Sequence, residues 1–224
     1  MTSGIIQTIM EILRQSKEDN VVSNDLKLDS EVLFQLGLPT SLPFMIYRRQ
    51  RIDIAMEAIN NGANVSEIVD LMTWKDFEGF VAGILSENNY RCVESFRRRG
   101  NSLIQGMEID VVGVRGQIII AVDAKMWGIR SGKISALKTA AEKQKERTLE
   151  LTTEFERLSK KLITLREGLY TIYPLIVTWL VEEVELHEGV PIVPVFKLNS
   201  FILDFHQYED IIVHYVGEMK GRIN

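Results

Sequence analysis

Apolar residues in the first third of the chain recur with the spacing of helices rather than strands. An amphipathic run, a short segment and a longer run predict helices over about 5–14, 30–36 and 44–59, separated by polar turns and a proline-containing break. A helix-turn-helix interpretation of residues 67–72 stays open, because any small helical module gives the same pattern. We therefore expect a helical N-terminal region over residues 1–72.

A different pattern begins at Thr73. Thr73 and Asp76 have the spacing of a variant capping box, which opens a predicted helix to about Asn88. Apolar runs bounded by turn residues then predict strands at 90–97, 108–114, 117–125, 175–180, 192–196 and 211–215, with a short helix near 199–205. The second and third strands are joined by an Arg115-Gly116 turn as a hairpin. This order predicts an α/β domain over 73–224, with a mixed central sheet flanked by helices and Ile118–Val122 as a central strand.

One long helix is expected over about 131–166. Its inward positions recur at alternating steps of three and four, which we call the heptad seam. The seam consists of Ile134, Leu137, Ala141, Gln144, Thr148, Leu151, Phe155, Leu158, Leu162, Leu165 and Leu169. A helix of roughly 36 residues extends about 54 Å, more than a compact domain of this size needs. Either the N-terminal helices or a second subunit should therefore pack along it, and the second case predicts a homodimer.

Composition limits the class of protein. The chain has 224 residues, of which 46% are hydrophobic and 25% charged, as in globular proteins with a substantial core. The single cysteine, Cys92, excludes an internal disulfide framework and a multi-cysteine zinc site, and favours a reducing cytoplasmic setting. No uncharged apolar run approaches the roughly 20 residues that span a bilayer, so we expect no membrane partner.

Charge is unevenly distributed along the chain. The formal net charge is −5, yet residues 91–147 contain twelve Lys and Arg against six Asp and Glu, a local charge of +6. A positive segment of this kind suits a polyanionic substrate. For the basic residues after Lys138, a solvated charged helix face is an equally good interpretation.

Acidic residues interrupt the two apolar strands of the predicted hairpin. An ionised carboxylate in an apolar sheet costs several kcal/mol unless it is paired or bound to metal. Asp123 and Lys125 share one face of their strand, because side chains at i and i+2 point the same way, and Asp110 on the partner strand can lie beside them. Mg²⁺ prefers carboxylate oxygens, and a lysine can orient water. The pattern predicts a metal-dependent phosphodiesterase site; the alternative is a strand-end salt bridge beside solvent.

Sequence context distinguishes the Asp123-Ala124-Lys125 motif from two similar motifs in the chain. An acid two residues before a lysine also occurs at Asp25–Lys27 and Glu218–Lys220, but neither copy ends a run as apolar as IIIAV. Glu78 lies on or beside the apolar stripe of the preceding helix, so it either points inward to a partner or reaches the rim of the core. Glu108 shares the strand face of Asp110 and is a reserve ligand, although an exposed strand-end acid is the simpler interpretation.

These residues resemble the PD-(D/E)XK nuclease superfamily, whose fold is restriction endonuclease-like, and in particular its archaeal Holliday junction resolvase and Mrr-like branches. The resemblance covers roughly residues 73–147 and consists of a helix with Glu78, a strand with Asp110, a strand with Asp123-Ala124-Lys125 and a following helix. It departs from the name motif because Ile109 stands where proline is usual and Asp123 where glutamate is frequent. Residues 1–72 have no counterpart in the minimal fold.

The resemblance implies a metal-dependent DNA endonuclease that hydrolyses phosphodiester bonds, structure-specific or of the restriction or repair type. It makes Asp110, Asp123, Glu78 and the Ala124 carbonyl the ligands of Mg²⁺, with Mn²⁺ as a substitute, and Lys125 the catalytic lysine. Lys133, Lys138 and Gln144 on the following helix are candidates for a further site residue. Contacts with DNA are expected from Arg97, Arg98, Arg99, Lys133 and Lys138. The alternative is a non-catalytic DNA-binding or assembly protein on a nuclease fold.

Overall fold

The protein divides into two compact units, Met1–Phe80 and Val81–Asn224, and the division falls within one helix, α5 (Trp74–Glu87). The sequence pattern changes eight residues earlier, just before the start of that helix. None of the described helices is both long and apolar enough to cross a membrane. The computed structural model describes residues 2–25, 28–100, 105–127, 132–163 and 165–220.

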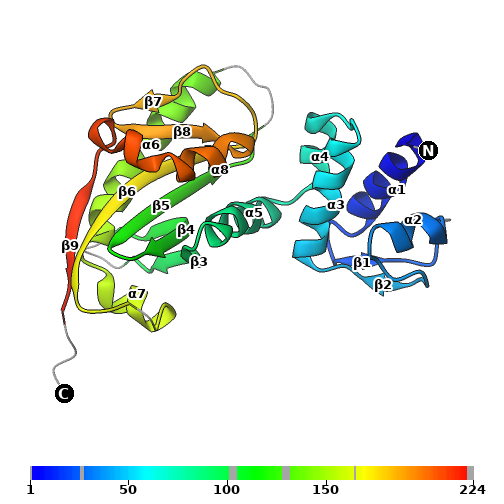
Figure 1. Cartoon of the computed structure of the whole chain (residues 1–224), viewed down its shortest axis with the longest axis horizontal. Helices are drawn as coiled ribbons and strands as arrows, with labels where there is room; N and C mark the ends of the chain where they lie inside the picture. Colours follow the sequence, from blue (N-terminus) through cyan, green and yellow to red (C-terminus); the bar gives the residue numbers. More distant parts are fainter. Residues whose placement is uncertain (1, 26–27, 101–104, 128–131, 164, 221–224) are drawn as a thin grey trace. The chain divides into compact units, whose positions relative to one another are not determined.

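The first unit is mainly helical, as the sequence predicts (Figure 1). Its elements are α1 (Thr2–Gln15), β1 (Val21–Val22), α2 (Ser30–Gln35), β2 (Phe44–Met45), α3 (Arg48–Asn60), α4 (Val65–Leu71) and the beginning of α5. The helix expected from residue 44 was placed too early. Phe44 and Met45 instead pair antiparallel with β1, and strands of two residues are too short to show a period in the sequence.

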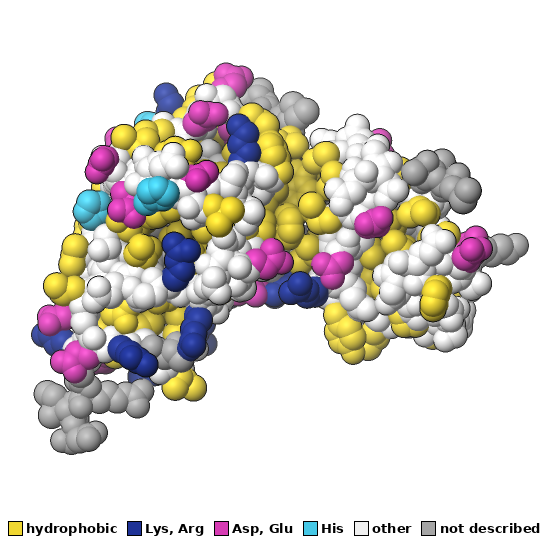
Figure 2. All heavy atoms as spheres, viewed as in Figure 1, with side chains coloured by type: hydrophobic (Ala, Val, Ile, Leu, Met, Phe, Trp, Pro, Cys, Tyr) yellow, Lys and Arg dark blue, Asp and Glu magenta, His cyan; other side chains and the backbone are white. Residues whose placement is uncertain are grey.

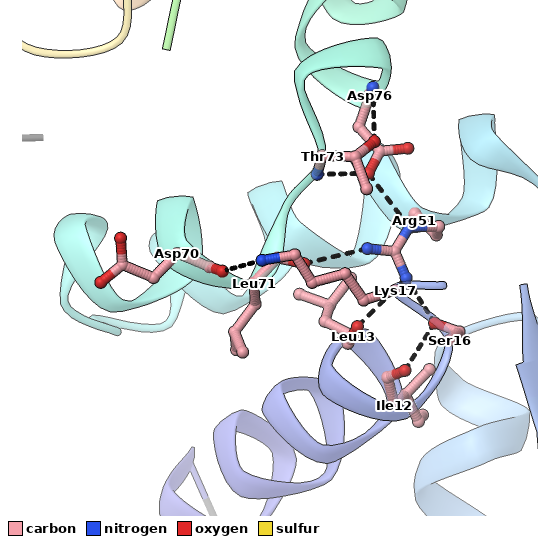
Figure 3. A network of polar contacts seen from close by, with 9 residues as sticks. All are labelled: Ile12, Leu13, Ser16, Lys17, Arg51, Asp70, Leu71, Thr73 and Asp76. Carbon is pink, nitrogen blue, oxygen red and sulfur yellow. Dashed lines mark hydrogen bonds and ion pairs between the residues drawn. The ribbon is translucent and has the colours of Figure 1, made fainter. Parts of the chain in front are cut away.

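A buried arginine on α3 connects the helices of this unit (Figure 3). Arg51 is 1% exposed. Its Nε donates to Asp76 Oδ2 at 3.1 Å, its Nη2 to the Leu71 carbonyl at 3.0 Å, and its Nη1 to the Leu13 carbonyl at 3.2 Å and to Ser16 Oγ. The guanidinium thereby bonds to α1, to the end of α4 and to the start of α5.

The predicted capping box opens α5. The Thr73 backbone N–H donates to Asp76 Oδ2 at 2.9 Å, and the Asp76 N–H donates to Thr73 Oγ1 at 3.1 Å. Both backbone groups would otherwise be without a partner at the helix start. The same Asp76 carboxylate therefore caps α5 and pairs with Arg51.

The second unit is a mixed sheet of seven strands with helices on its faces (Figure 1). Hydrogen-bonded neighbours follow the order β3-β4-β5-β6-β8-β7, and β9 pairs with β6. The β5–β6 and β6–β8 pairs are parallel, and the others are antiparallel. The strands are β3 (Arg91–Arg98), β4 (Met107–Arg115), β5 (Ile118–Lys125), β6 (Gly168–Thr178), β7 (Leu186–His187), β8 (Val190–Pro194) and β9 (Tyr215–Met219). The predicted mixed sheet and hairpin are confirmed.

Helices cover both faces of β5, the predicted central strand. α6 (Lys133–Leu151) lies behind the sheet and α8 (Val195–Leu203) in front of it in the view of Figure 1. Ile119 to Val122 are completely buried. Packing is close enough that a Cβ added to Gly113 of β4 would lie 3.2 Å from Leu85 of α5. Beyond α8, the chain forms two short 3₁₀ turns, Phe205–Gln207 and Glu209–Ile211.

The single long helix expected over 131–166 is wrong. α6 ends at Leu151, and a second helix, α7 (Phe155–Lys161), follows after a turn. Hydroxyls of Thr152 and Thr153 donate to backbone carbonyls three residues earlier, at 2.6 and 2.9 Å, and these bonds accompany the end of the regular helix.

The heptad seam packs on the sheet of its own unit. Leu137 and Ala141 pack in a hydrophobic cluster with Ile176 and Ile192. Leu151 packs in a second cluster, which includes Ile119 and Ile172 of the sheet. Neither the N-terminal helices nor a second subunit is therefore needed to cover these residues. The last seam residue, Leu169, is 58% exposed and belongs to β6.

Three predicted boundaries in the C-terminal part were displaced. β6 begins at Gly168 rather than at residue 175, and its first residues pair with β9. The helix expected near 199–205 starts at Val195, where the expected strand 192–196 has already ended. Of the apolar run 211–215, only Tyr215 lies in a strand, where it begins β9, which ends at Met219.

Candidate active site

The hairpin register brings the two embedded acids together at the end of β5. Val111 lies opposite Val122, and the same register continued by one residue places Asp110 opposite Asp123. Side chains of opposed residues project from the same face of a sheet. The Ala124 N–H donates to Asp110 Oδ2 at 2.8 Å. Asp110 is thus bonded across the strands within one residue of Asp123.

Two cations lie against the Asp123 carboxylate. Lys125 Nζ is 2.9 Å from Asp123 Oδ1 and 2.8 Å from Oδ2, and Arg147 Nη1 is 3.3 Å from Oδ1. The Asp123 side chain is 3% exposed, while those of Lys125 and Arg147 are 23% and 33% exposed. The carboxylate is therefore buried, and its cationic partners reach from it toward solvent.

Burial changes the chemistry of Asp110. It raises the pKa of the Asp110 carboxyl, and the charge of Asp123 raises it further, to about 6. The hydrogen bond from the Ala124 N–H and the charge of Lys125 oppose this rise. Near neutral pH the two acids therefore repel each other across a short distance, and a cation shared by both would relieve that repulsion.

Two side chains from α6 complete the surroundings of the site. Gln144 is fully buried, and its Nε2 donates to the carbonyl of Ala121, two residues before Asp123. Arg147 lies one turn further along the helix, within ion-pair distance of Asp123. Gln144 was among the three candidates from this helix, whereas Arg147 was not identified as a site residue. Its i+3 spacing from Gln144 on the helix was the signal that could have indicated it.

The other two helix candidates are either paired with another carboxylate or exposed. Lys133 is 12% exposed and pairs with Glu182 at 2.6 Å, and it also donates to the Trp127 carbonyl at 3.2 Å. Its charge is thus already neutralised within the protein. Lys138 is exposed on α6.

Glu78 lies on α5 within the first unit, two residues before the division of the chain, and is 4% exposed. It has an interaction partner within the protein. Of the two expectations, an inward position or the rim of the core, the structure shows the buried one, and the role of Glu78 as a third metal ligand stays a prediction. Glu108, the reserve ligand, instead pairs with Arg97 at 2.6 Å on the exposed edge of the hairpin.

The arginines expected to contact DNA differ in availability. Arg97 is exposed but paired with Glu108. Arg98 is 12% exposed and pairs with Glu150 at 2.5 Å and Glu154 at 3.3 Å, which fixes β3 to the end of α6. Arg99 is exposed, in a segment beyond the end of β3. Arg98 therefore has a structural role that its position in an arginine triplet did not reveal.

Charge on the surface is mixed. Acidic and basic side chains are interspersed over the α8 face of the second unit, with hydrophobic side chains between them (Figure 2). Exposed apolar residues of α8 include Phe196 and Leu203, at 62% and 63%. The described residues of this face of the second unit therefore form no uniform basic surface (Figure 2).

The donor set fits a hard divalent cation. Asp110 and Asp123 offer carboxylate oxygens from neighbouring strands, the ligand type that Mg²⁺ and Mn²⁺ prefer. Among the described residues, none donates a hydrogen bond of ordinary geometry to the buried Asp123 Oδ2, although Lys125 Nζ lies close to it. Both oxygens of this carboxylate are thus within ion-pair distance of a cationic side chain, and a bound metal would share or replace that contact.

Comparison with known proteins finds a relative by sequence. No protein-family model matches the chain. An uncharacterized protein of Archaeoglobus fulgidus is 30% identical over 137 residues, which cover 61% of this chain and 95% of that protein. The chain therefore belongs to the same protein family as this archaeal protein. The crystal structure of protein VC1899 from Vibrio cholerae aligns with 94% of this chain at 12% identity and a TM-score of 0.39, and the chain spans about half, 52%, of that protein's length.

Proposed function

We propose that this protein is a metal-dependent DNA endonuclease of the PD-(D/E)XK type, which hydrolyses phosphodiester bonds. The observation that supports it most is the convergence of Asp110 and Asp123 from adjacent strands, with the Lys125 ammonium 2.9 Å from Asp123. An apolar strand that contained these acids for packing alone would gain nothing from their mutual repulsion.

Each residue has a definite task in this proposal. Asp110 and Asp123 hold Mg²⁺, and the resemblance adds Glu78 and the Ala124 carbonyl as ligands. The bound ion would activate water and neutralise charge on the phosphate. Lys125 Nζ, partly exposed at the rim, donates a hydrogen bond to the attacking water or to a phosphate oxygen. Arg147 offers a second partly exposed cation beside the same carboxylate.

One observation favours the alternative of a DNA-binding protein without catalysis. Lys125 and Arg147 already neutralise Asp123, so the cluster is electrostatically balanced without a metal. In that case Asp110 and Asp123 would only position two cations for contact with phosphate. The two candidates differ in whether purified protein breaks the DNA backbone.

Nicking of supercoiled plasmid in Mg²⁺ or Mn²⁺, against the same reaction in EDTA, tests the proposal. We expect Asp110→Ala, Asp123→Ala and Lys125→Met each to lower the rate by about a hundredfold or more. The matched controls are Glu218→Ala and Lys220→Ala, which remove the same motif at β9 and should retain activity. Equal nicking by wild-type and Lys125→Met protein would contradict the proposed catalytic site. No nicking by any form, with DNA binding intact, would favour the alternative.

Metal binding is tested independently of cleavage by calorimetric titration with Mn²⁺. Asp123→Ala should abolish binding at the carboxylate site. A second group of potential ligand atoms must be controlled for, because Glu142, His187 and Glu188 bring three such atoms within 4.8 Å of one another. His187→Ala is therefore measured in parallel, and we expect it to leave the affinity of the carboxylate site unchanged.

We further propose that double-strand cleavage requires a homodimer. One active site reaches one DNA strand, and two subunits related by a two-fold axis present two active sites to the two strands. The heptad seam no longer supports this state, since the seam is covered within the unit. Light scattering of the protein alone and with a duplex oligonucleotide tests it. A monomer in both conditions would restrict the activity to nicking.

A further inference from the structure

A hollow lies at the other end of β5, where the hairpin turns. It has a volume of about 720 Å³ and is lined by residues of the hairpin, of the start of β3 and of the segment between α7 and β6. This is within the range of roughly 300–1,000 Å³ typical of small-ligand pockets. Asp123 lies six positions after Gln117, which lines the hollow, and this corresponds to roughly 20 Å along the strand. The hollow is therefore separate from the carboxylate site.

Three arginines line this hollow: Arg91, Arg115 and Arg166. Glu167 is the single acidic residue of the lining, so the hollow has a net positive charge in a chain whose net charge is −5. Within the described part of the chain, no ion pair is found for any of the three. Elsewhere in the same unit Arg97, Arg98, Arg147 and Arg157 are all paired with carboxylates.

The hollow is also organised in advance. The Arg115 guanidinium lies 4.5 Å from the centroid of the Tyr90 ring and donates to the Asn88 carbonyl at 3.4 Å. Gly116 has a φ of +58°, which other residues adopt only with strain, and the Gln117 carbonyl accepts from the Thr171 N–H at 2.9 Å. The turn that presents Arg115 is thus held against β6.

The backbone on the opposite side of the hollow is similarly fixed. The Tyr170 hydroxyl accepts from the Arg166 N–H at 3.1 Å and donates to the Arg166 carbonyl at 2.9 Å. This closes a short loop that presents the exposed Arg166 side chain. Two of the three arginines that would contact a ligand, Arg115 and Arg166, therefore stand on constrained backbone, and this lowers the conformational entropy lost on binding.

We propose that this hollow binds a small molecule with a di- or triphosphate group. Guanidinium groups bind phosphate oxygens in bidentate pairs, and three around one concavity match a compact group with several negative charges. Gln117 and Asn89 in the lining supply amide groups for the uncharged part of the ligand. A concave site surrounded by cations suits such a ligand better than a duplex, whose phosphates are spread along an extended surface. The proposal does not depend on the nuclease assignment.

Isothermal titration calorimetry in EDTA tests it, with inorganic triphosphate, ATP, adenosine and a duplex oligonucleotide as separate probes. We expect triphosphate and ATP to bind with one-to-one stoichiometry and adenosine not to bind. If ATP binds more tightly than triphosphate, the natural ligand is a nucleotide; equal affinities indicate recognition of the phosphate chain alone.

Variants assign the binding to the hollow. Arg91→Gln and Arg166→Gln change exposed side chains and should each weaken ATP or triphosphate binding about tenfold, as expected for the loss of a charge-assisted contact. Arg157→Gln, an exposed arginine paired with Glu154, and Asp123→Ala should not change it. The proposal is overturned if neither phosphate probe binds, if Arg91→Gln and Arg166→Gln bind as wild type, or if duplex alone binds and is lost in these variants.

Discussion

Asp110 is a residue at which stability and the proposed chemistry oppose each other. Its pKa in the folded protein is about 6, against an ordinary value of 3.8, because burial and the neighbouring Asp123 disfavour its charge. The folded state thus holds the Asp110 proton more tightly than the unfolded chain does. The stability due to this proton is fully present below pH 3.8, decreases as the pH rises toward 6, and is absent above that.

Asp110→Asn should therefore stabilise the metal-free protein. The amide oxygen can still accept the Ala124 hydrogen bond, while the repulsion with Asp123 is removed. We expect the Tm at pH 8 in EDTA to rise by about 3 °C, the effect of roughly 1 kcal/mol in a chain of this size. At pH 4 the gain should largely vanish, because wild-type Asp110 is then mostly protonated. Thermal melts at both pH values, with Glu108→Gln as the control, measure this; an equal gain at both would contradict it.

Arg147 competes with any cation for Asp123. Its Nη1 lies 3.3 Å from Asp123 Oδ1, and a partly exposed pair of this kind is worth up to about 1 kcal/mol. Arg147→Gln should accordingly tighten Mn²⁺ binding, by up to about fivefold. Titration calorimetry measures the change, with Arg157→Gln as the matched control. Weaker binding in Arg147→Gln would mean instead that the arginine is needed to position the carboxylate.

The sequence indicated some of these site residues and not others for a physical reason. Asp123 and Lys125 share a face through their spacing in one strand, which a local rule gives. Asp110 lies opposite Asp123 only because the turn consists of Gly116 and Gln117, one residue later than the expected Arg115-Gly116 turn, and the sequence pattern did not fix this register. Arg147 comes from α6, and the packing of that helix on the sheet decides which of its turns faces Asp123. Its spacing from Gln144 therefore becomes informative only once Gln144 is known to face β5.

At the scale of elements, the heptad seam shows what periodicity can and cannot predict. The seam correctly identified buried positions such as Leu151, Leu158 and Leu162, which are at most 8% exposed. It did not identify their partner, because a sheet covers an apolar stripe as well as another helix does. It also continued across the break after Leu151, since residues of α7 happen to keep the same spacing toward the same core.

Two leucines of α6 test this packing. Leu151 is fully buried in the core, whereas Leu149 on the same helix is 51% exposed. Leu151→Ala should lower the free energy of unfolding by about 2–5 kcal/mol, and Leu149→Ala by less than about 0.5 kcal/mol. Urea denaturation measures both. If the seam were instead a subunit interface, Leu151→Ala would dissociate the protein and its cost would depend on protein concentration.

The longer strands were largely predictable from the sequence, and the shortest strands were not. The β4–β5 hairpin follows from two apolar runs around a short turn, and β5 from its uninterrupted apolar residues. β1, β2 and β7 have two residues each, too few to show alternation. β6 begins at Gly168 because hydrogen bonds to β9 extend it, and such pairing between distant segments leaves no local signal.

At the scale of the whole molecule, the division into two compact units predicts that local damage in one unit need not unfold the other. Arg51 is the residue with which to test this. It is 1% exposed and bonds to Asp76, Leu13, Ser16 and Leu71, all within the first unit. Its loss would leave the buried Asp76 carboxylate without its cation, at a cost of about 3–5 kcal/mol.

Arg51→Gln should therefore raise amide hydrogen exchange throughout α1, α3 and α4 while β4, β5 and β6 keep their wild-type protection. Lys17→Ala is the matched control, because Lys17 donates to the Asp70 carbonyl at 2.6 Å, at the edge of the same network. It should leave exchange nearly unchanged. Hydrogen exchange read by mass spectrometry resolves the two units by peptide. Loss of protection in the central strands of Arg51→Gln would show that the two units unfold as one, and the sheet that positions Asp110 and Asp123 would then depend on the helical unit for its stability.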